Sequence, residues 1–134
     1  MIELHPATNG DCEFYYQLRN DPDARRNSRR MDPITMMDHM RWWTETADYR
    51  WVAWEGSVRR GTIRLGVDGT VSIVVHRLHR GKGYGTQMLK ALIPEAKALG
   101  FTRIHGEIAP ENYGSQKAFL LAGWHPVLFE AYPQ

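Results

Sequence analysis

A glycine-rich turn between a predicted strand and a predicted helix constrains the fold of this chain more than any other feature. Residues 71–75 are β-branched and apolar apart from one serine, which is typical of a strand. Residues 84–99 carry apolar side chains at helical spacing, and Gly100 follows as a helix stop. The turn between them ends in Arg80-Gly81-Lys82-Gly83-Tyr84-Gly85. A strand, a tight turn and a long helix in this order predict an α/β fold.

The same turn has the chemistry of an anion site. Glycines let the backbone approach a ligand closely, and the free amides and dipole at a helix start attract negative charge. Arg80 and Lys82 add positive charge. Two common phosphate-binding motifs do not fit, because GxGxxG needs glycine at Thr86 and GxxxxGK[ST] needs glycine at His76. A flexible connection without a ligand is the alternative interpretation.

The rest of the pattern predicts short strands and helices within one domain, residues 1–134, without repeats or linkers. Three central strands are separated by turn residues, which favours an antiparallel arrangement. Thr35 and Asp38 resemble a capping box that opens a helix, and Pro22 ends the helix before it. Pro94 predicts a kink in the long helix. Strands are expected at 2–4, 51–55, 61–65, 71–75, 103–108 and 124–129, and helices at about 9–21, from 36, at 84–99 and at 112–122.

Composition excludes several classes of function. Lys and Arg number 17 against 15 Asp and Glu, so a net charge of +2 gives no reason to expect nucleic acid as a partner. No run of about 18 apolar residues suits a membrane span, and a single cysteine, Cys12, indicates a reducing cytoplasm. His76 and His79 have no third ligand at metal spacing, so we expect no metal.

Two motifs resemble those of the GNAT superfamily of acyl-coenzyme A N-acyltransferases. The [QR]xxGx[GA] signature is matched by Arg80, Gly83 and Gly85. The family's second motif is similar to Asn112-x-x-Ser115-x-x-x-Phe119-x-x-x-Gly123-Trp124. The resemblance implies a mixed, mostly antiparallel sheet of about six strands flanked by about four helices, with a splayed central strand pair. It also implies acetyl-coenzyme A as co-substrate.

The resemblance further implies which residues bind the cofactor. Amides of the turn would hold the pyrophosphate, the end of the preceding strand would pair with pantetheine, and a backbone N–H near Val75 would face the oxyanion. Asn112 would bind the pantetheine amide portion. The predicted cofactor-binding residues are Val75, Arg80, Gly81, Lys82, Gly83, Tyr84, Gly85 and Asn112.

The sequence offers candidate residues for both the catalytic base and the catalytic acid. Strand alternation puts His105 and Glu107 on one face, and Glu107 is the predicted base, with a carboxylate paired to an arginine as the alternative. His76 or His105 would substitute for it. The tyrosine that usually protonates the departing thiolate is Phe119 here, so Ser115, Tyr113 or a water takes that role, or the thiolate leaves unassisted.

The N-terminal third contains Leu18-Arg19-Asn20-Asp21-Pro22-Asp23-x-Arg25, Ile34 and His39-x-x-Trp42-Trp43. This pattern resembles a subset of the superfamily that acts on amino sugars of nucleotide-sugars, including the pseudaminic-acid-pathway N-acetyltransferases. Arginines between 25 and 30 would neutralise a diphosphate, and a tryptophan would stack on a base or sugar. The predicted acceptor-binding residues are Asn20, Arg30, His39 and Trp43. In the alternative interpretation the arginines form a solvated loop, and Met36, Met40 and Trp43 belong to the core.

Other functions stay open beside transfer to a small-molecule amine. The acceptor could be a peptide N-terminus or a lysine, and a sensor that binds coenzyme A without turnover is compatible with Phe119. A protein-interaction module would bind no cofactor at all. About eleven residues follow Gly123 where the family usually has two strands, which hints at a homodimer.

Overall fold

The computed structural model describes residues 1–26, 32–106, 113–124 and 130–131. In these ranges, a six-stranded sheet follows the order of the chain. All neighbouring strands are antiparallel except β4 and β5, which are parallel. The strands are β1 (Glu3–Pro6), β2 (Tyr49–Glu55), β3 (Val58–Leu65), β4 (Thr70–Val75), β5 (Ile104–Gly106) and β6 (Glu130–Ala131). The predicted mixed, mostly antiparallel α/β fold is confirmed.

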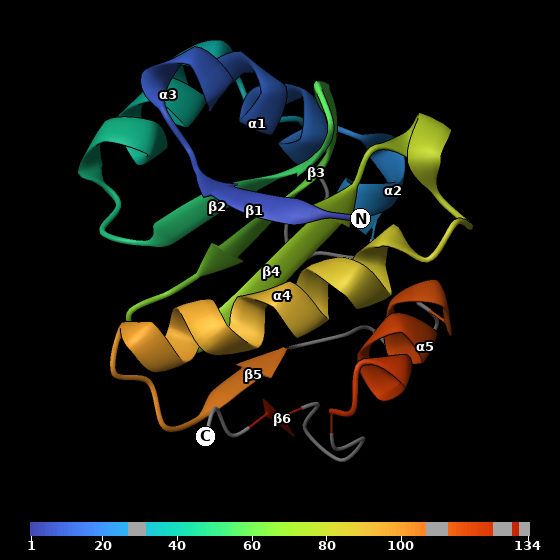
Figure 1. Cartoon of the computed structure of the whole chain (residues 1–134). Coiled ribbons are helices and arrows are strands. Elements are labelled where there is room, and N and C mark those ends of the chain that lie inside the picture. Colours follow the sequence, from blue (N-terminus) through green and yellow to red (C-terminus); the bar gives the residue numbers. More distant parts are fainter. Residues whose placement is uncertain (27–31, 107–112, 125–129, 132–134) are drawn as a thin grey trace.

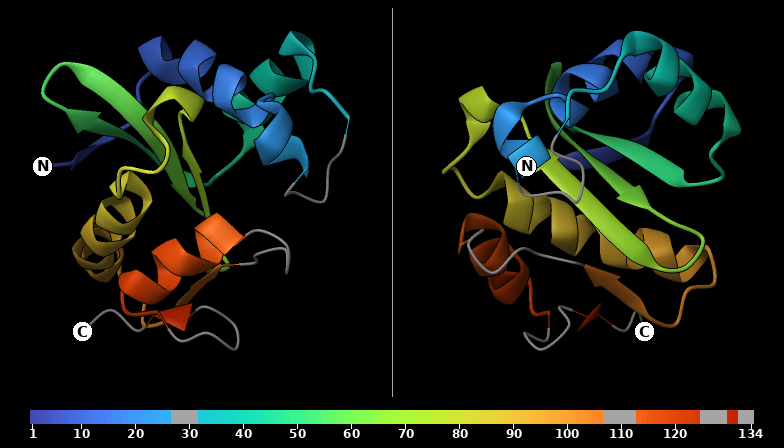
Figure 2. Two further views of the ribbon diagram at one scale, coloured as in Figure 1. Left: turned by 90° about the vertical axis from the view of Figure 1, so that its right-hand side faces the viewer. Right: turned by 180° about the vertical axis from the view of Figure 1, so that it is seen from behind.

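Helices cover both faces of the sheet (Figure 1). Helices α1 (Cys12–Arg19) and α3 (Met36–Glu45) lie on one face, with the short α2 (Pro22–Arg26) at the end of α1. Helix α4 (Tyr84–Ala98) covers the opposite face and contacts β1, β3 and β4. Helix α5 (Tyr113–Leu121) packs beside α4, as both views of Figure 2 show. The short 3₁₀ helices η1 (Asn9–Asp11) and η2 (Arg77–His79) complete the described elements.

One helix was not predicted. Helix α2 was missed because Pro22 also suits the first position of a helix, and the side chain of Asp21 accepts a hydrogen bond from the Ala24 amide at 3.1 Å. Helix α4 runs through Pro94 to Ala98, in agreement with the helix predicted at 84–99. Met36 and Met40 are exposed, so the alternative interpretation that places them in the core is wrong. The predicted strand at 124–129 lies almost entirely outside the described residues.

The main core lies between the sheet and helix α4. Met88, Leu89 and Leu92 on α4 are fully buried, as are Ile63 and Leu65 on β3. A smaller apolar cluster packs under α1 and α3 around Tyr15, Trp43 and Val52. None of the helices in the described ranges combines the length and apolar character needed to cross a lipid bilayer.

The two edges of β4 are paired over different lengths within the described residues. β4 pairs with β3 from Val71 to Val75, whereas the described β5 pairs with β4 only at Thr70 and Val71. The splayed central strand pair that the family resemblance implied would begin after Gly106, outside the described residues, so the splay stays a prediction. No described strand residue pairs with the C-terminal half of β4 on the edge away from β3.

Close packing of α5 against the sheet depends on a glycine. A Cβ on Gly106 would stand 2.6 Å from Cε1 of Phe119, whose ring is 1% exposed and meets the Trp124 ring edge-on at a centroid distance of 4.8 Å. Gly106 therefore makes the room that the Phe119 ring fills.

We expect Gly106→Ala to lower the free energy of unfolding by about 1–3 kcal/mol, because the new methyl group overpacks the Phe119 ring. Gly114→Ala is the matched control, since a Cβ on Gly114 in α5 meets no atom within 4 Å. Urea denaturation of both variants checks this. Equal stability of Gly106→Ala and the wild type would contradict the packing argument.

Candidate active site

The end of β4 presents backbone groups on the edge of the strand that faces away from β3. The amide of His76 donates to the Arg60 carbonyl at 2.9 Å, so His76 faces β3. Backbone groups alternate in direction along an antiparallel strand, and the N–H of Val75 therefore points away from β3. It lies on the edge that no described residue of β5 pairs with. This orientation suits the oxyanion contact expected from the sequence.

The glycine-rich turn follows η2 and leads into α4. Gly81 and Gly83 have φ values of 77° and 82°, in the left-handed region that favours glycine, and Gly83 is the residue before the first helical position. A Cβ on either residue would meet no atom within 4 Å, so this stretch of backbone is open to solvent. The first amides of α4 and its dipole therefore face an accessible space suited to an anion. Lys82 is exposed between the two glycines.

Gly85 has a different role from the two glycines before it. A Cβ there would stand 3.4 Å from the Ala118 Cβ of α5 and 3.7 Å from Cγ2 of Val75. The first turn of α4 thus packs directly against both the end of β4 and α5. Ser115 is one turn before Ala118, and residues three apart share a helix face, so the half-buried Ser115 is on the side of α5 that faces this junction.

Arg80 is bound by the protein rather than extended into solvent. Its Nε donates to the Val75 carbonyl at 3.0 Å, and Nη2 donates to Oδ2 of Asp21 at 2.8 Å. The sequence placed Arg80 among the cofactor contacts, but in this structure its guanidinium joins parts of the chain.

Tyr84 is anchored by a cluster that the sequence analysis missed. Its hydroxyl donates to Oε1 of Glu55 at 2.9 Å, and Arg60 Nη2 donates to the same oxygen at 2.8 Å. These two hydrogen bonds, from Tyr84 first and then Arg60, lower the pKa of Glu55. Arg60 Nη1 also lies 2.8 Å from Nδ1 of His79. The cluster ties the start of α4 and the end of η2 to the β2–β3 hairpin, so the phenol of Tyr84 is used inside the protein.

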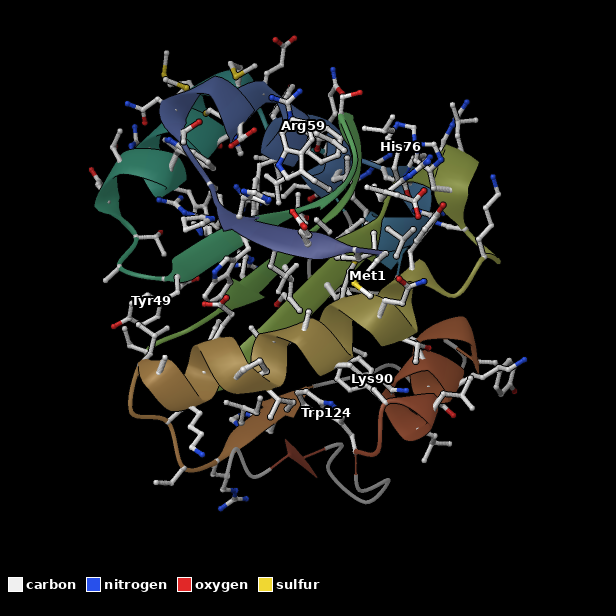
Figure 3. All side chains as sticks on the ribbon, in the orientation of Figure 1. Met1, Tyr49, Arg59, His76, Lys90 and Trp124 are labelled. Atoms are coloured by element: carbon white, nitrogen blue, oxygen red, sulfur yellow. The ribbon has the colours of Figure 1, made fainter. Side chains whose placement is uncertain are left out.

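A pocket of about 260 Å³ adjoins the end of β4. His76, labelled in Figure 3, is in its wall; its Nδ1 accepts a hydrogen bond from the Leu78 amide and its ring stacks on Phe14. The predicted acceptor residue Asn20 also lines this pocket, although its amide group bonds the backbone N–H and C=O of Ile34 at 2.7 and 2.8 Å. The lining residues are Gln17, Leu18, Asn20, Asp21, Pro22, His76 and Arg77.

Two other predicted acceptor residues lie in packed surroundings. His39 is fully buried, with Nε2 2.8 Å from the Cys12 carbonyl and Nδ1 3.0 Å from Nη1 of Arg19. Trp43 is 7% exposed, and its Nε1 donates to Oδ1 of Asn9 at 3.2 Å. Both side chains join α3 to α1 instead of lining the pocket. This placement agrees with the alternative interpretation of Trp43 as a core residue.

The structure describes only some of the remaining predicted residues. Glu107, Asn112 and Arg30 lie outside the described residues, so their roles stay predictions. His105 Nε2 lies 3.1 Å from Oγ1 of Thr70 at the start of β4. Thr70 is five residues from Val75, about 16 Å along the strand at 3.3 Å per residue, so His105 is not a substitute base for chemistry at the strand end.

Comparison with known proteins identifies the family. The profile of the acetyltransferase (GNAT) domain matches residues 2–125. The chain therefore belongs to the GNAT acetyltransferase domain family. An uncharacterised N-acetyltransferase of Bacillus subtilis, YobR, is 35% identical over 69 residues, which are 50% of this chain and 28% of that protein. The chain thus spans little more than a quarter of the length of this relative.

Solved structures support the same fold. A domain from Methanocaldococcus jannaschii has a TM-score of 0.82 at 19% identity, covering 93% of this chain and 88% of that one. The aminoglycoside acetyltransferase AAC(6')-Ib, in complex with coenzyme A and kanamycin, has a TM-score of 0.77 at 17% identity, with 93% and 84% covered. At these identities the likeness establishes the architecture.

Buried His39 makes stability depend on pH. Burial lowers the pKa of His39, and the charges of Arg19 and Arg50 lower it further, against the opposing effect of the Cys12 carbonyl. As the pH falls through the unfolded value of about 6.5, the unfolded chain takes up a proton that the folded chain resists. The free energy of unfolding should therefore fall between about pH 7.5 and 5.5.

We expect His39→Gln to be less stable at pH 7.5 by about 1–3 kcal/mol and to show a shallower loss of stability on acidification. The slope should not vanish, because burial also lowers the pKa of His79. Chemical denaturation at several pH values measures both effects. His5→Gln, at an exposed side chain beside Glu3, is the control, and an unchanged slope in His39→Gln would refute the assignment.

Proposed function

We propose that this chain, as one GNAT domain over residues 1–134, transfers an acetyl group from acetyl-coenzyme A to a primary amine. The observation that carries the proposal is the open, left-handed turn at Gly81 and Gly83, directly before α4 and near the end of β4, where no described residue pairs with the edge away from β3. A diphosphate would suit this turn, since the space around both glycines is open and the amides at a helix start favour an anion. Family membership and the coenzyme A bound to the aminoglycoside acetyltransferase support the same ligand.

The proposed cofactor contacts follow from backbone groups. Amides of residues 81–85 would hold the diphosphate, with Lys82 adding charge at its exposed position. The edge of β4 ending at Val75 would pair with the amides of the pantetheine arm, and Asn112 stays a predicted contact for the same arm. The Val75 N–H would stabilise the oxyanion, a contribution of about 3 kcal/mol for a well-placed donor.

The proposed reaction is direct attack in a ternary complex. The neutral amine nitrogen bonds to the thioester carbon, the tetrahedral intermediate collapses, and the carbon–sulfur bond breaks to release the coenzyme A thiolate. One amine proton goes to a base, for which Glu107 stays the prediction. The protein would contribute chiefly by holding the two substrates in reacting geometry.

In our proposal the thiolate receives its proton through Ser115, whose hydroxyl takes up a proton from water as it gives its own. Phe119 occupies the position of the usual tyrosine, is 1% exposed and has no proton to donate. Ser115 is one helical turn earlier, on the face of α5 directed at the first turn of α4. A thiol pKa near 8.5 also permits the thiolate to leave unassisted.

For the acceptor we propose an amino sugar, carried by a nucleotide in the form that the N-terminal residues resemble. The pocket beside β4 supports a polar acceptor, since five of its seven lining residues are polar or charged. Kanamycin in the aminoglycoside acetyltransferase complex shows that this fold accepts a polyhydroxylated amine in that protein. Given where Trp43 and His39 lie, contact with this acceptor would come from the pocket residues, with Asn20 among them. A homodimer stays a prediction.

A second candidate is a sensor that binds coenzyme A without turnover, and the buried Phe119 favours it. The two functions separate in one assay. Incubating the protein with acetyl-coenzyme A and a panel of amines should release free thiol in an acceptor-dependent way. The panel should contain UDP-linked amino sugars, kanamycin, spermine and an alanine-initiated peptide. Calorimetric binding of coenzyme A without thiol release from any amine would favour the sensor.

Gly83→Ala should weaken coenzyme A binding about tenfold, because a left-handed alanine costs about 1–2 kcal/mol and its Cβ narrows the approach to the amides. Gly100→Ala is the matched control, since Gly100 has a φ of 91°, is equally open and follows the other end of α4. It should lose stability but keep its affinity. Isothermal titration calorimetry measures both, and equal affinities in the two variants would contradict a diphosphate at the turn.

A further inference from the structure

Arg80 joins two parts of the chain that the sequence keeps 59 residues apart. Through Nε it holds the carbonyl of Val75, the last residue of β4, and through Nη2 it holds the carboxylate of Asp21. Asp21 stands between α1 and α2. A planar guanidinium with two fixed acceptors has little freedom to move without breaking a contact. The residue that begins the glycine-rich turn is thus tied to the junction of these helices.

Asp21 transmits this contact to the pocket wall. Its Oδ2 accepts from both Arg80 and the Ala24 amide, and its carbonyl accepts from the Arg25 amide at 3.0 Å. The Asp21 side chain is 10% exposed and the Arg80 side chain 33%, so the carboxylate is largely shielded from solvent whereas the guanidinium is half-buried. Asp21 and Pro22 both line the pocket beside β4. One carboxylate therefore caps α2, pairs with Arg80 and forms part of the pocket.

We propose that Arg80 is a positioning residue rather than a ligand of the diphosphate, and that the Arg80–Asp21 pair couples occupation of the glycine-rich turn to the order of the acceptor pocket. The inference rests on the proposed function, since it takes coenzyme A as the occupant. An anion held by the amides after Arg80 restrains the turn, and the guanidinium passes that restraint to α2. Such coupling between sites is reciprocal, so an acceptor would also tighten cofactor binding.

Lys82, the other cation of the turn, supports the assignment of a positioning role to Arg80. Lys82 is exposed, whereas the Arg80 guanidinium is committed to Val75 and Asp21. Lys82 would supply charge to the ligand, and Arg80 would hold the geometry of the strand end. The Val75 carbonyl that Arg80 binds belongs to the residue whose N–H we assign to the oxyanion. Arg80 would therefore also fix the direction of that donor.

Hydrogen exchange with and without coenzyme A tests the coupling without an identified acceptor. In the wild type, coenzyme A should slow exchange in the turn at 81–85, and also slow the amides of Ala24 and Arg25 about fivefold, the lower range of typical coupling between sites. Asp21→Asn should keep the protection of the turn and lose that of α2. Asparagine also caps helices, so this variant preserves the start of α2.

Arg80→Lys separates positioning from direct binding of the diphosphate. Lysine keeps the charge but cannot make both contacts. We therefore expect coenzyme A to slow amide exchange in the turn of this variant, but not in α2. Asp11→Asn is the matched control, because Asp11 is also buried, accepts from the Thr8 amide at 2.9 Å and pairs with Arg59 at 3.0 Å. In that variant both regions should stay protected.

Each other outcome overturns the inference in a distinguishable way. Protection of the turn without any change at Ala24 and Arg25 in the wild type would show that the sites are not coupled. Retained protection of α2 in Asp21→Asn or Arg80→Lys would show that another contact carries the coupling. Absence of protection at the turn itself, at coenzyme A concentrations up to millimolar, would overturn the proposed function and the coupling with it.

Discussion

The unequal pairing of the two edges of β4 is the constraint on which the site depends. One edge is bonded to β3 up to Val75, which fixes the direction of each backbone group along the strand. On the other edge, the described part of β5 pairs only with Thr70 and Val71. Backbone N–H and C=O groups must find partners, and here the Val75 carbonyl finds one in Arg80. Pairing with β3 thus fixes the backbone directions of β4, and in the proposed function the edge away from β3 would bind the ligand.

Small residues allow the helices to approach this strand end. Gly85 brings α4 within contact of Val75 and Ala118, and Gly106 admits the Phe119 ring under α5. Gly61 on β3 leaves room for two neighbours, since a Cβ there would stand 3.1 Å from Cε of Met88 on α4 and 2.5 Å from the Val74 carbonyl of β4. It follows Arg60, the extra residue at the register shift between β2 and β3. The shift directs Arg60 toward Glu55 and Tyr84, so the irregularity in the sheet helps to fix the start of α4.

Sequence reasoning worked where short-range patterns determine structure. The β-branched and apolar content of 71–75 predicted β4, and helical spacing predicted α4. The Thr35 cap was predicted, and its hydroxyl accepts from the Asp38 amide at 3.1 Å. These features depend on residues a few positions apart, which a single sequence displays directly.

Contacts between distant segments could not be predicted in the same way. A histidine and two tryptophans on an amphipathic helix are compatible with either a binding surface or a core, and the decision depends on what α1 places opposite them. Arg19 and Cys12 occupy that position, so His39 is buried between the two helices. The motif likewise indicated that position 80 matters without indicating its partner, because Asp21 reaches it only after the sheet has formed. A motif identifies a residue, but the role of that residue depends on which distant carboxylate the fold brings within hydrogen-bonding distance.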